Sequence, residues 1–332
     1  MKSKTYMIAE IGSNHDGSLE IALEMVEKAK KAKADAVKFQ TFQVDKLLNP
    51  LVFQENNSEA NWVYDELKKV EIDEEFHKKI KEKCVQLKID FISSPFDTDS
   101  LKIVSKYCDK IKIASSEITN LPFLKEVGQY GKPVILSTGM SFLGEIEKAI
   151  SALISGGVTD LSILHCISLY PLNAEDANLN FIQTLKQCFN LPVGFSDHSL
   201  DDTLALSAVS LGAQIIEKHV TLKREDRIFD HAHSMEFKEF QSMIDKIRMI
   251  ESALGNGIKT ISAKEMEIKQ GSNRSFFAVE QLEPGTVLTL ENIKAVRPLI
   301  GIPVVFQDEI IGKKIKKNIK PDYPIFWEDI DW

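Results

Sequence analysis

The sequence predicts a (β/α)₈ TIM barrel, an α/β fold, followed by a small β-rich domain. Eight short apolar runs recur between residues 7 and 220, segments with helical periodicity separate them, and the pattern changes after Gly257. Strands of a parallel sheet that is covered on both faces read as continuous apolar runs, and active sites of such barrels lie where the strands end. Each run here ends in polar or charged residues. The runs span residues 7–12, 36–41, 90–96, 110–115, 133–139, 161–166, 192–197 and 215–220.

Helices are expected between the strands. In the first helical segment the apolar positions 19, 22, 23 and 26 share one face, and Ser18 stands where an N-cap belongs. Strand, helix and strand in this alternation indicate parallel pairing through right-handed crossovers. The long connection at residues 47–70 is interpreted as an active-site loop with a short helix. The helical segments are residues 18–34, 74–88, 144–157, 202–213 and 237–255.

The domain boundaries follow from the change in pattern. Residues 1–258 are assigned to the barrel, the polar stretch 259–274 to a linker and residues 275–332 to the small domain. The small domain contains an internal repeat, because residues 282–293 and 319–330 superimpose at a constant offset. Leu282 then matches Ile319, and Pro284 matches Pro321. A unit of about 60 residues is close to the lower size limit for independent stability, so we expect it to pack against another protein surface.

Composition excludes several classes of protein. The net charge of −8 argues against a nucleic-acid partner, and the basic stretch 313–320 is interpreted as a solvated face. No apolar run approaches the roughly 20 residues that cross a bilayer, and no apolar leader begins the chain. We therefore expect no membrane partner and a cytoplasmic location. The cysteines form no CxxC pair and are expected to be reduced thiols. They are Cys84, Cys108, Cys166 and Cys188.

Three lysines near strand ends predict an anionic substrate. Lys38, Lys112 and Lys218 lie within apolar runs, and a buried lysine is costly unless an anion neutralises it. Hydroxyl groups and backbone amides at the same strand ends suit phosphate or carboxylate oxygens, and phosphate chemistry fits best. The other polar residues expected at the barrel mouth are Glu10, Asn14, His15, Gln40, Ser94, Ser115, Glu117, Ser137, Thr138, Asp197, His198, Glu217 and His219.

Two histidines predict a metal site. His198 and His219 follow neighbouring parallel strands, so their imidazoles can converge on one ion and leave positions open for water and substrate. One of Asp230, His231 and His233, from the loop after the last strand, could complete the shell. His15 and His165 are interpreted as structural. Two lysines for a dianion, a metal for a carbonyl and carboxylates for proton transfer suit carbon–carbon bond formation between a phosphorylated enol and an aldehyde.

Motifs along nearly the whole chain resemble the sialic acid synthase, or nonulosonate synthase, family. They include IAEIGSNHDGSLEIA, VKFQTF, KIASSEITNLPFL, KPVILSTGM, LHCISLYP, GFSDHS and IEKHVTL, and the tail from residue 275 resembles the antifreeze-like SAF domain. The resemblance implies condensation of phosphoenolpyruvate with N-acetylmannosamine or a related 2-acetamido sugar, with release of phosphate. It also implies a divalent cation, with Mn²⁺ expected before Mg²⁺ or Co²⁺, and a homodimer in which each SAF domain is swapped onto the partner barrel.

The same resemblance assigns roles to residues. Glu10 is expected nearest the transferring protons, with Glu117 able to share that role, and His198 and His219 would bind the metal. Arg297 would reach the sugar's N-acyl group in the partner barrel. The sugar would contact Glu10, Gln40, Glu117 and Asp230, and phosphoenolpyruvate would be held by Lys38, Ser94, Lys112, Ser115, Ser137, Tyr170 and Ser196.

Two departures from the family pattern lie where the acceptor would bind. Ser168 replaces a frequent asparagine as the phosphate-side donor, and the loop after the last strand reads IFDHAHS, which lacks a Gly-Pro pair and adds His233. Alternatives therefore stay open. They are a legionaminic or pseudaminic acid synthase acting on a 6-deoxy diacetamido hexose, a sugar-phosphate synthase of the DAHP or KDO8P kind, and a non-catalytic sugar-binding protein.

Overall fold

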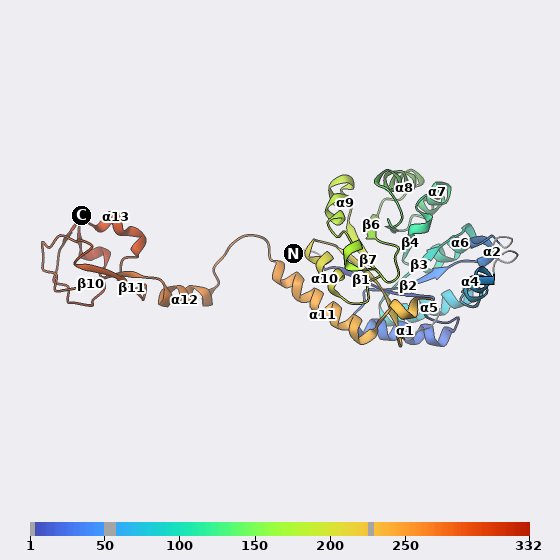
Figure 1. The fold of residues 1–332 in the computed structure, drawn as a ribbon, viewed down its shortest axis with the longest axis horizontal. Helices are drawn as coiled ribbons and strands as arrows, with labels where there is room; N and C mark the ends of the chain where they lie inside the picture. Colours follow the sequence, from blue (N-terminus) through green and yellow to red (C-terminus); the bar gives the residue numbers. More distant parts are fainter. Residues whose placement is uncertain (1–3, 50–57, 225–228) are drawn as a thin grey trace. The chain divides into compact units, whose positions relative to one another are not determined.

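The computed structural model describes residues 4–49, 58–224 and 229–332, without the side chains of residues 58–61 and 229. The chain divides into two compact units, Met1–Gly255 and Asn256–Trp332. Figure 1 shows a ring of helices around a sheet in the first unit and short strands in the second. Among the described residues, no helix combines the length and apolar character that crossing a lipid bilayer requires.

The first unit is a closed barrel of eight parallel strands, as the sequence predicts. Each strand pairs with the next, and β1 also pairs with β8, which closes the ring. A short strand, β9 (Met235–Glu236), extends the pairing of β8. The barrel strands are β1 (Tyr6–Gly12), β2 (Ala36–Thr41), β3 (Asp90–Pro95), β4 (Lys110–Ile113), β5 (Val134–Ser137), β6 (Leu161–Cys166), β7 (Val193–Asp197) and β8 (Ile215–Thr221).

The interior of the barrel has an apolar layer beneath a polar one. Ile8, Ala36, Ile92, Ile135, Leu164 and Ile215 form a separate buried cluster. Because side chains alternate along a strand, the residue two positions later faces the same side. Those residues are Glu10, Lys38, Ser94, Ser137, Cys166 and Glu217. The polar layer therefore lies at the carboxyl ends of the strands, and the apolar layer lies beneath it, deeper in the barrel.

The outward faces of the strands pack against the helices in the main core, which includes Met7, Val37, Phe39, Phe91 and Phe195. Ser18 caps α1 as expected, because its side chain accepts a hydrogen bond from the Ile21 amide at 3.3 Å. The helices of this unit are α1 (Leu19–Lys31), α2 (Val44–Leu47), α4 (Ser58–Lys69), α5 (Glu74–Leu87), α6 (Thr98–Tyr107), α7 (Leu121–Gly128), α8 (Leu143–Gly156), α9 (Phe181–Phe189), α10 (Thr203–Ser210) and α11 (Phe237–Leu254), with 3₁₀ turns η1 (Ser115–Glu117), η2 (Ala174–Asp176) and η3 (Phe229–His233).

The second unit begins with a helix inside the stretch that the sequence assigns to a linker. The helix is α12 (Ala263–Ser272), and the Ser262 side chain caps it by accepting from the Glu265 amide at 3.2 Å. All its residues except one are exposed. The sequence of this helix therefore has no apolar periodicity from which it could be predicted. The remaining elements are β10 (Ser275–Ala278), β11 (Ile293–Val296), η4 (Val304–Phe306), α13 (Gln307–Ile310), β12 (Lys314–Ile315), η5 (Trp327–Asp329) and β13 (Ile330–Asp331).

The internal repeat of the second unit is visible in the structure. Leu282 and Ile319 exchange reciprocal backbone hydrogen bonds of 2.9 Å, so the two copies pair with each other. Gly285 and Asp322, which match in the repeat, both have positive φ, of +90° and 62°, because each copy turns at that position. Equivalent apolar residues fill one core. That core contains Phe276, Ala278, Leu282, Leu288, Ile293, Ile302, Ile310, Ile315, Ile319, Ile325 and Ile330.

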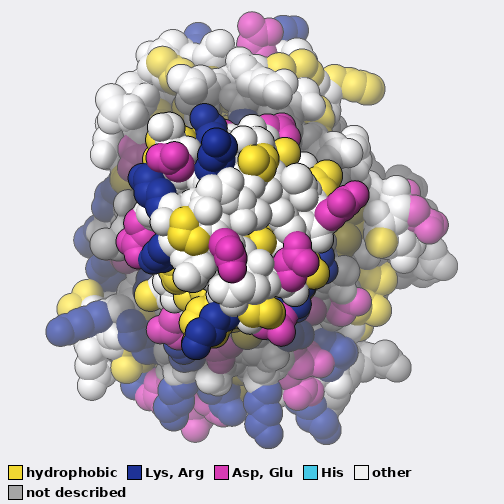
Figure 2. Space-filling view, turned by 90° about the vertical axis from the view of Figure 1, so that its left-hand side faces the viewer, with side chains coloured by type: hydrophobic (Ala, Val, Ile, Leu, Met, Phe, Trp, Pro, Cys, Tyr) yellow, Lys and Arg dark blue, Asp and Glu magenta, His cyan; other side chains and the backbone are white. Residues whose placement is uncertain are grey.

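The face of the molecule in Figure 2 carries charged side chains of both signs. Figure 2 shows lysine and arginine side chains interspersed with acidic ones rather than gathered in one basic surface. In the basic stretch 313–320, Lys316 and Lys317 are exposed while Ile315 and Ile319 enter the core. Lys317 pairs with Asp329 at 2.6 Å. These lysines form a solvated face.

Candidate active site

A cavity of about 270 Å³ opens at the carboxyl ends of the barrel strands. Its walls combine buried charges, hydroxyl groups and two imidazoles from strands that are distant in the sequence. The structure thereby brings together most of the residues that the sequence predicts. The lining residues are Glu10, Lys38, Gln40, Ser94, Lys112, Ala114, Ser115, Ser116, Ser137, Met140, Cys166, Ser168, Tyr170, Ser196, His198, Glu217 and His219.

Two lysines and two carboxylates form a buried network at the floor of the cavity. Lys38 Nζ lies 2.9 Å from Glu10 Oε2 and 3.8 Å from Glu217 Oε1. Lys112 Nζ lies 3.6 Å from the same Glu217 oxygen and donates to Ser137 Oγ at 2.6 Å. Glu217 Oε1 also accepts from Ser196 Oγ at 3.0 Å, whereas its Oε2 has no hydrogen-bond partner among the residues that the structure describes.

Burial and charge pairing oppose each other in this network. Burial raises the pKa of Glu217, but Lys112 and Lys38 outweigh it and hold that pKa below its ordinary value. Burial lowers the pKa of Lys38, yet Glu10 and Glu217 more than compensate. For Lys112 burial dominates, and its pKa is lowered. Glu217 is therefore ionised, and Lys112 is the less firmly charged of the two lysines.

Hydroxyl groups line one wall beside Lys112. Ser115 Oγ accepts from the Gly139 amide at 3.0 Å and contacts Cys166 Sγ at 3.4 Å. A Cβ atom at Gly139 would lie 2.4 Å from Ser168 Oγ and 2.8 Å from Ser115 Oγ, so a larger residue there would displace these two hydroxyl groups. Ser94 Oγ is buried and has no hydrogen-bond partner in the described part of the chain. These unpaired or adjustable donors are suited to the oxygens of a bound anion.

The two histidines predicted to hold a metal lie together at the cavity. Their ring centres are 5.5 Å apart, and the Tyr170 ring lies 4.2 Å from that of His198. His198 Nδ1 donates to the Ile167 carbonyl at 2.8 Å, which leaves Nε2 as a free lone pair. Burial, reinforced by His219, lowers the pKa of His198 to about 3, so it is neutral. A neutral imidazole with its other nitrogen anchored is the form that ligates metals.

Three residues to which the family resemblance assigns a role do not line the cavity. Glu117 ends η1 and accepts from Asn120 Nδ2 at 2.9 Å. Asp230 lies behind His219, with its Oδ2 3.3 Å from His219 Nδ1. Arg297 is exposed on the second unit.

The interpretation of Lys218 as an anion-binding residue is wrong. Lys218 Nζ pairs with Asp197 Oδ2 at 2.8 Å and donates to the carbonyls of Ser199 and Asp201. Because side chains alternate along β8, Lys218 points out of the barrel while Glu217 and His219 point in. An internal carboxylate already neutralises it.

The remaining histidines have structural partners. His15 packs against Phe39 and Phe76, as expected for a structural residue. His165 Nε2 donates to the Ala177 carbonyl at 2.8 Å, also as expected. His231, one candidate for completing the metal shell, has both nitrogens in use. Its Nδ1 contacts Thr221 Oγ1 at 2.9 Å and its Nε2 contacts Asp16 Oδ1 at 3.0 Å.

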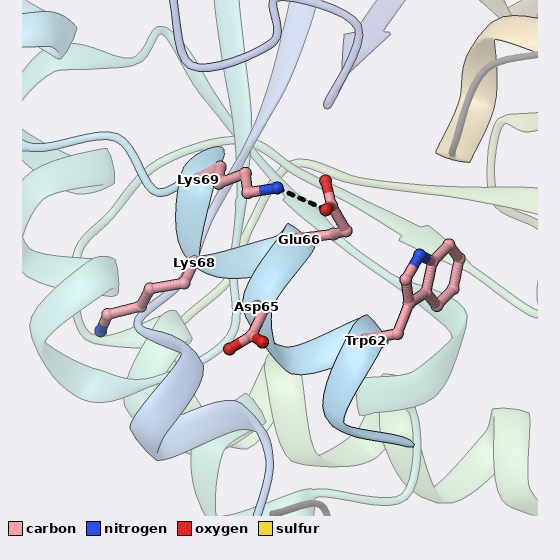
Figure 3. Close-up of a pocket in the computed structure, with 5 residues that line it drawn as sticks. All are labelled: Trp62, Asp65, Glu66, Lys68 and Lys69. Carbon is pink, nitrogen blue, oxygen red and sulfur yellow. Dashed lines mark hydrogen bonds and ion pairs between the residues drawn. The ribbon is translucent and has the colours of Figure 1, made fainter. Parts of the chain in front are cut away.

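A second depression, of about 510 Å³, lies on the surface of α4. Figure 3 shows its five lining side chains, Trp62, Asp65, Glu66, Lys68 and Lys69, with Lys69 paired to Glu66. All five lie on one helix and are exposed or half-buried. We therefore assign the function to the smaller cavity in the barrel, where buried charges from several strands converge.

Comparison with known proteins identifies the family. Residues 25–259 match the NeuB family, and residues 273–331 match the SAF domain. The chain belongs to the NeuB family. This confirms the resemblance drawn from the motifs, including the SAF domain at the C-terminal end.

Named relatives of this NeuB-family chain are synthases of sialic-type acids. N,N'-diacetyllegionaminic acid synthase of Legionella pneumophila is 38% identical and covers 98% of this chain and 94% of its own. Pseudaminic acid synthase of Campylobacter jejuni is 36% identical, with coverages of 96% and 94%. N-acetylneuraminate-9-phosphate synthase of Mus musculus is 29% identical, with coverages of 99% and 94%.

A solved structure of the same kind is also similar to this NeuB-family chain. N-acetylneuraminic acid synthetase from Leptospira borgpetersenii superimposes with a TM-score of 0.72 at 36% identity, covering 80% of this chain and 90% of that one. A truncated 3-deoxy-D-arabino-heptulosonate 7-phosphate synthase from Thermotoga maritima has a TM-score of 0.61 at 16% identity, which shows only a shared fold.

Proposed function

We propose that the protein condenses phosphoenolpyruvate with a 6-deoxy diacetamido hexose and water to give a nine-carbon α-keto acid and phosphate. The observation that carries the proposal is the convergence of Lys38, Lys112, His198 and His219 on one cavity. The identities to legionaminic and pseudaminic acid synthases support the acceptor. N-acetylmannosamine remains the second candidate, because the Leptospira N-acetylneuraminic acid synthetase is 36% identical to this chain.

The floor of the cavity is suited to phosphoenolpyruvate. Lys38 and Lys112 supply positive charge, and Ser94, Ser115, Ser137, Ser168 and Ser196 supply hydroxyl donors around them. A bound dianion would draw both lysines away from Glu217, which shares them in the free protein. Charge that develops on the departing phosphate is then stabilised by donors already in place.

The carboxylates are suited to proton transfer. C3 of phosphoenolpyruvate attacks the open-chain aldehyde of the acceptor, water adds to the cationic C2, and the C–O bond to phosphate breaks. The attacking water gives up two protons as C2 becomes a ketone: the buried, ionised Glu217 can accept one at its unpaired Oε2, and the departing phosphate takes the other. The alkoxide formed from the aldehyde takes up one proton, which is proposed to come from the ammonium group of Lys38 that Glu10 holds, and Glu217 then returns its proton to Lys38.

The imidazoles fit a divalent cation. Both face one cavity, and His198 has a free lone pair because Ile167 holds its other nitrogen. Imidazole ligands suit first-row transition ions such as Co²⁺ better than Mg²⁺, and oxygen ligands from water or substrate at the open positions would suit Mn²⁺. Such an ion, when bound, polarises the acceptor's aldehyde. The Tyr170 ring packs against that of His198 at a tilt of 34° and restricts its orientation.

The SAF unit is proposed to act in a homodimer, each copy reaching the partner's barrel. Arg297 is exposed on this unit and unneeded for its apolar core, so it is available to contact the N-acyl group of an acceptor. Arg297→Ala is expected to raise the acceptor KM at least tenfold with an unchanged KM for phosphoenolpyruvate. An unchanged acceptor KM, measured by steady-state kinetics, would contradict the role.

An acceptor panel tests the proposed function. Purified protein with phosphoenolpyruvate and Mn²⁺ is given the 6-deoxy diacetamido precursors of legionaminic and pseudaminic acid, or N-acetylmannosamine, and phosphate release is followed. We expect the highest kcat/KM with one of the diacetamido sugars. Higher kcat/KM with N-acetylmannosamine would favour the second candidate, and no release with any sugar would overturn the enzymatic proposal.

A further inference from the structure

His233, at the end of η3, takes no part in the chemistry described above. Its side chain is nine-tenths buried, and its Nε2 lies 3.3 Å from Asp230 Oδ1. The other oxygen of Asp230 lies 3.3 Å from His219 Nδ1. Asp230 therefore stands between two imidazoles at ion-pair distance, and among the described residues neither facing nitrogen has a partner that meets hydrogen-bond geometry.

The lining of the cavity shows which ring nitrogen of His219 is directed towards a bound substrate. His219 lines the cavity, whereas Asp230 and His233 do not. With Nδ1 turned towards Asp230, the nitrogen left for the cavity is Nε2. His198 has the same arrangement, because its Nδ1 is held by the Ile167 carbonyl. Both imidazoles thus have Nδ1 anchored behind them, which is the usual outer-shell arrangement of metal-binding histidines.

Other contacts fix the backbone around Asp230, and the ion-pair contacts of its carboxylate within the described part of the chain are with His219 and His233. Ser234 Oγ donates to the Asp230 carbonyl, and Asn14 Nδ2 donates to Ser234 Oγ at 2.8 Å. A carboxylate held on one oxygen alone can rotate about its terminal torsion, which is broad in energy. An imidazole within ion-pair distance of the second oxygen limits that freedom and keeps the first oxygen facing His219.

We propose that His233 is a positioning residue of the metal site, acting through Asp230 to fix the tautomer and orientation of His219. The inference rests on the metal role of His198 and His219 in the proposed function. It adds a residue that sets the strength of the site without touching the ion.

A competing arrangement makes His233 a ligand. One ligand atom each from His219, Asp230 and His233 lies within 4.8 Å of the others, which is close enough to share an ion. His198 stands outside that set. The cavity-facing pair is favoured, because it leaves coordination positions open to substrate in the cavity that holds both lysines.

The test compares His233→Phe, which keeps a ring but removes the donor, with His233→Gln, which restores an amide donor. Mn²⁺ affinity is measured by the loss of the free-ion electron paramagnetic resonance signal, and pulsed resonance counts the imidazoles on bound Mn²⁺. We expect roughly 10–100-fold weaker binding in His233→Phe, partial recovery in His233→Gln, and two imidazoles in the wild type and both variants. His165→Asn, which removes a buried histidine outside the cavity, should bind like the wild type.

Each contrary outcome has a separate meaning. Unchanged Mn²⁺ affinity in His233→Phe overturns the positioning role but leaves the proposed function standing. Loss of one imidazole in that variant makes His233 a ligand and also overturns the proposal. Absence of Mn²⁺ binding by the wild type overturns both the inference and the metal part of the proposed function. Thermal melting in EDTA confirms that each variant is folded.

Discussion

At the scale of single residues, the cavity depends on lysines that share a carboxylate. Glu217 Oε1 lies within 4 Å of both Lys38 and Lys112, so a substrate anion competes with an internal one for the same charges. This arrangement keeps two lysines charged when no substrate is bound, since buried charges without a partner are costly. The position of both lysines near the ends of predicted strands was enough to predict that they line the site. Nothing in the sequence showed that Glu217 would pair with them.

Lys112→Met tests the phosphate-binding role. Removing a donor that stabilises developing charge is expected to lower kcat/KM for phosphoenolpyruvate by about 10²–10³-fold. Steady-state phosphate release measures the effect. Lys110→Met is the matched control, because Lys110 lies two residues earlier on β4 and pairs with Asp90 at the opposite end of the strand. Comparable losses in the two variants would count against a specific role for Lys112.

At the scale of elements, β8 shows how much alternation alone reveals. Successive residues of a strand point to opposite faces, so Glu217 and His219 share the interior and Lys218 belongs to the outer face. Applied to the run at residues 215–220, this rule would have separated Lys218 from the other two lysines. The Asp197 partner of Lys218 follows from the register of β7 and β8, where the two residues are paired. Register between distant strands is not readable from one chain's sequence.

Lys218→Met is expected to destabilise the barrel rather than to weaken substrate binding. The change leaves Asp197 buried without its cation, at a cost of about 3–5 kcal/mol in the free energy of unfolding. Chemical denaturation measures the loss. The double variant Lys218→Met with Asp197→Leu should recover part of it, since no buried charge then remains. A raised KM for phosphoenolpyruvate with unchanged stability would instead return Lys218 to the substrate site.

At the scale of the whole molecule, the fold was more predictable than the site. Apolar runs and helical periodicity placed all eight barrel strands within about two residues, because burial on both faces leaves a strong mark on sequence. The 37-residue repeat located both halves of the SAF unit, whose core residues follow it. Helix α12 is exposed and has no apolar face, so the sequence did not predict it. Asp230 and His233 were placed in the shell only as candidates, because a loop's path over the barrel mouth depends on tertiary contacts.

A fall in pH should destabilise the barrel already at pH values above those at which carboxylates titrate. Burial lowers the pKa of His15 to about 4 and also lowers the pKa values of His77 and His165. The unfolded chain binds these protons near pH 6.5, so stability is full above that value and falls as the pH drops towards 4. Urea midpoints in EDTA at pH 7.5, 6 and 5 should decrease in that order. His15→Asn should reduce the slope, and a midpoint independent of pH would contradict the buried, neutral state of these histidines.

The central claim is that the lysine-lined cavity of the barrel carries out a condensation that breaks the C–O bond of phosphoenolpyruvate. Phosphoenolpyruvate labelled with ¹⁸O at its bridging oxygen, incubated with the protein, Mn²⁺ and the best acceptor sugar, tests this claim directly. Phosphorus NMR should show the label in the released phosphate. Unlabelled phosphate would mean cleavage of the P–O bond and would contradict the mechanism.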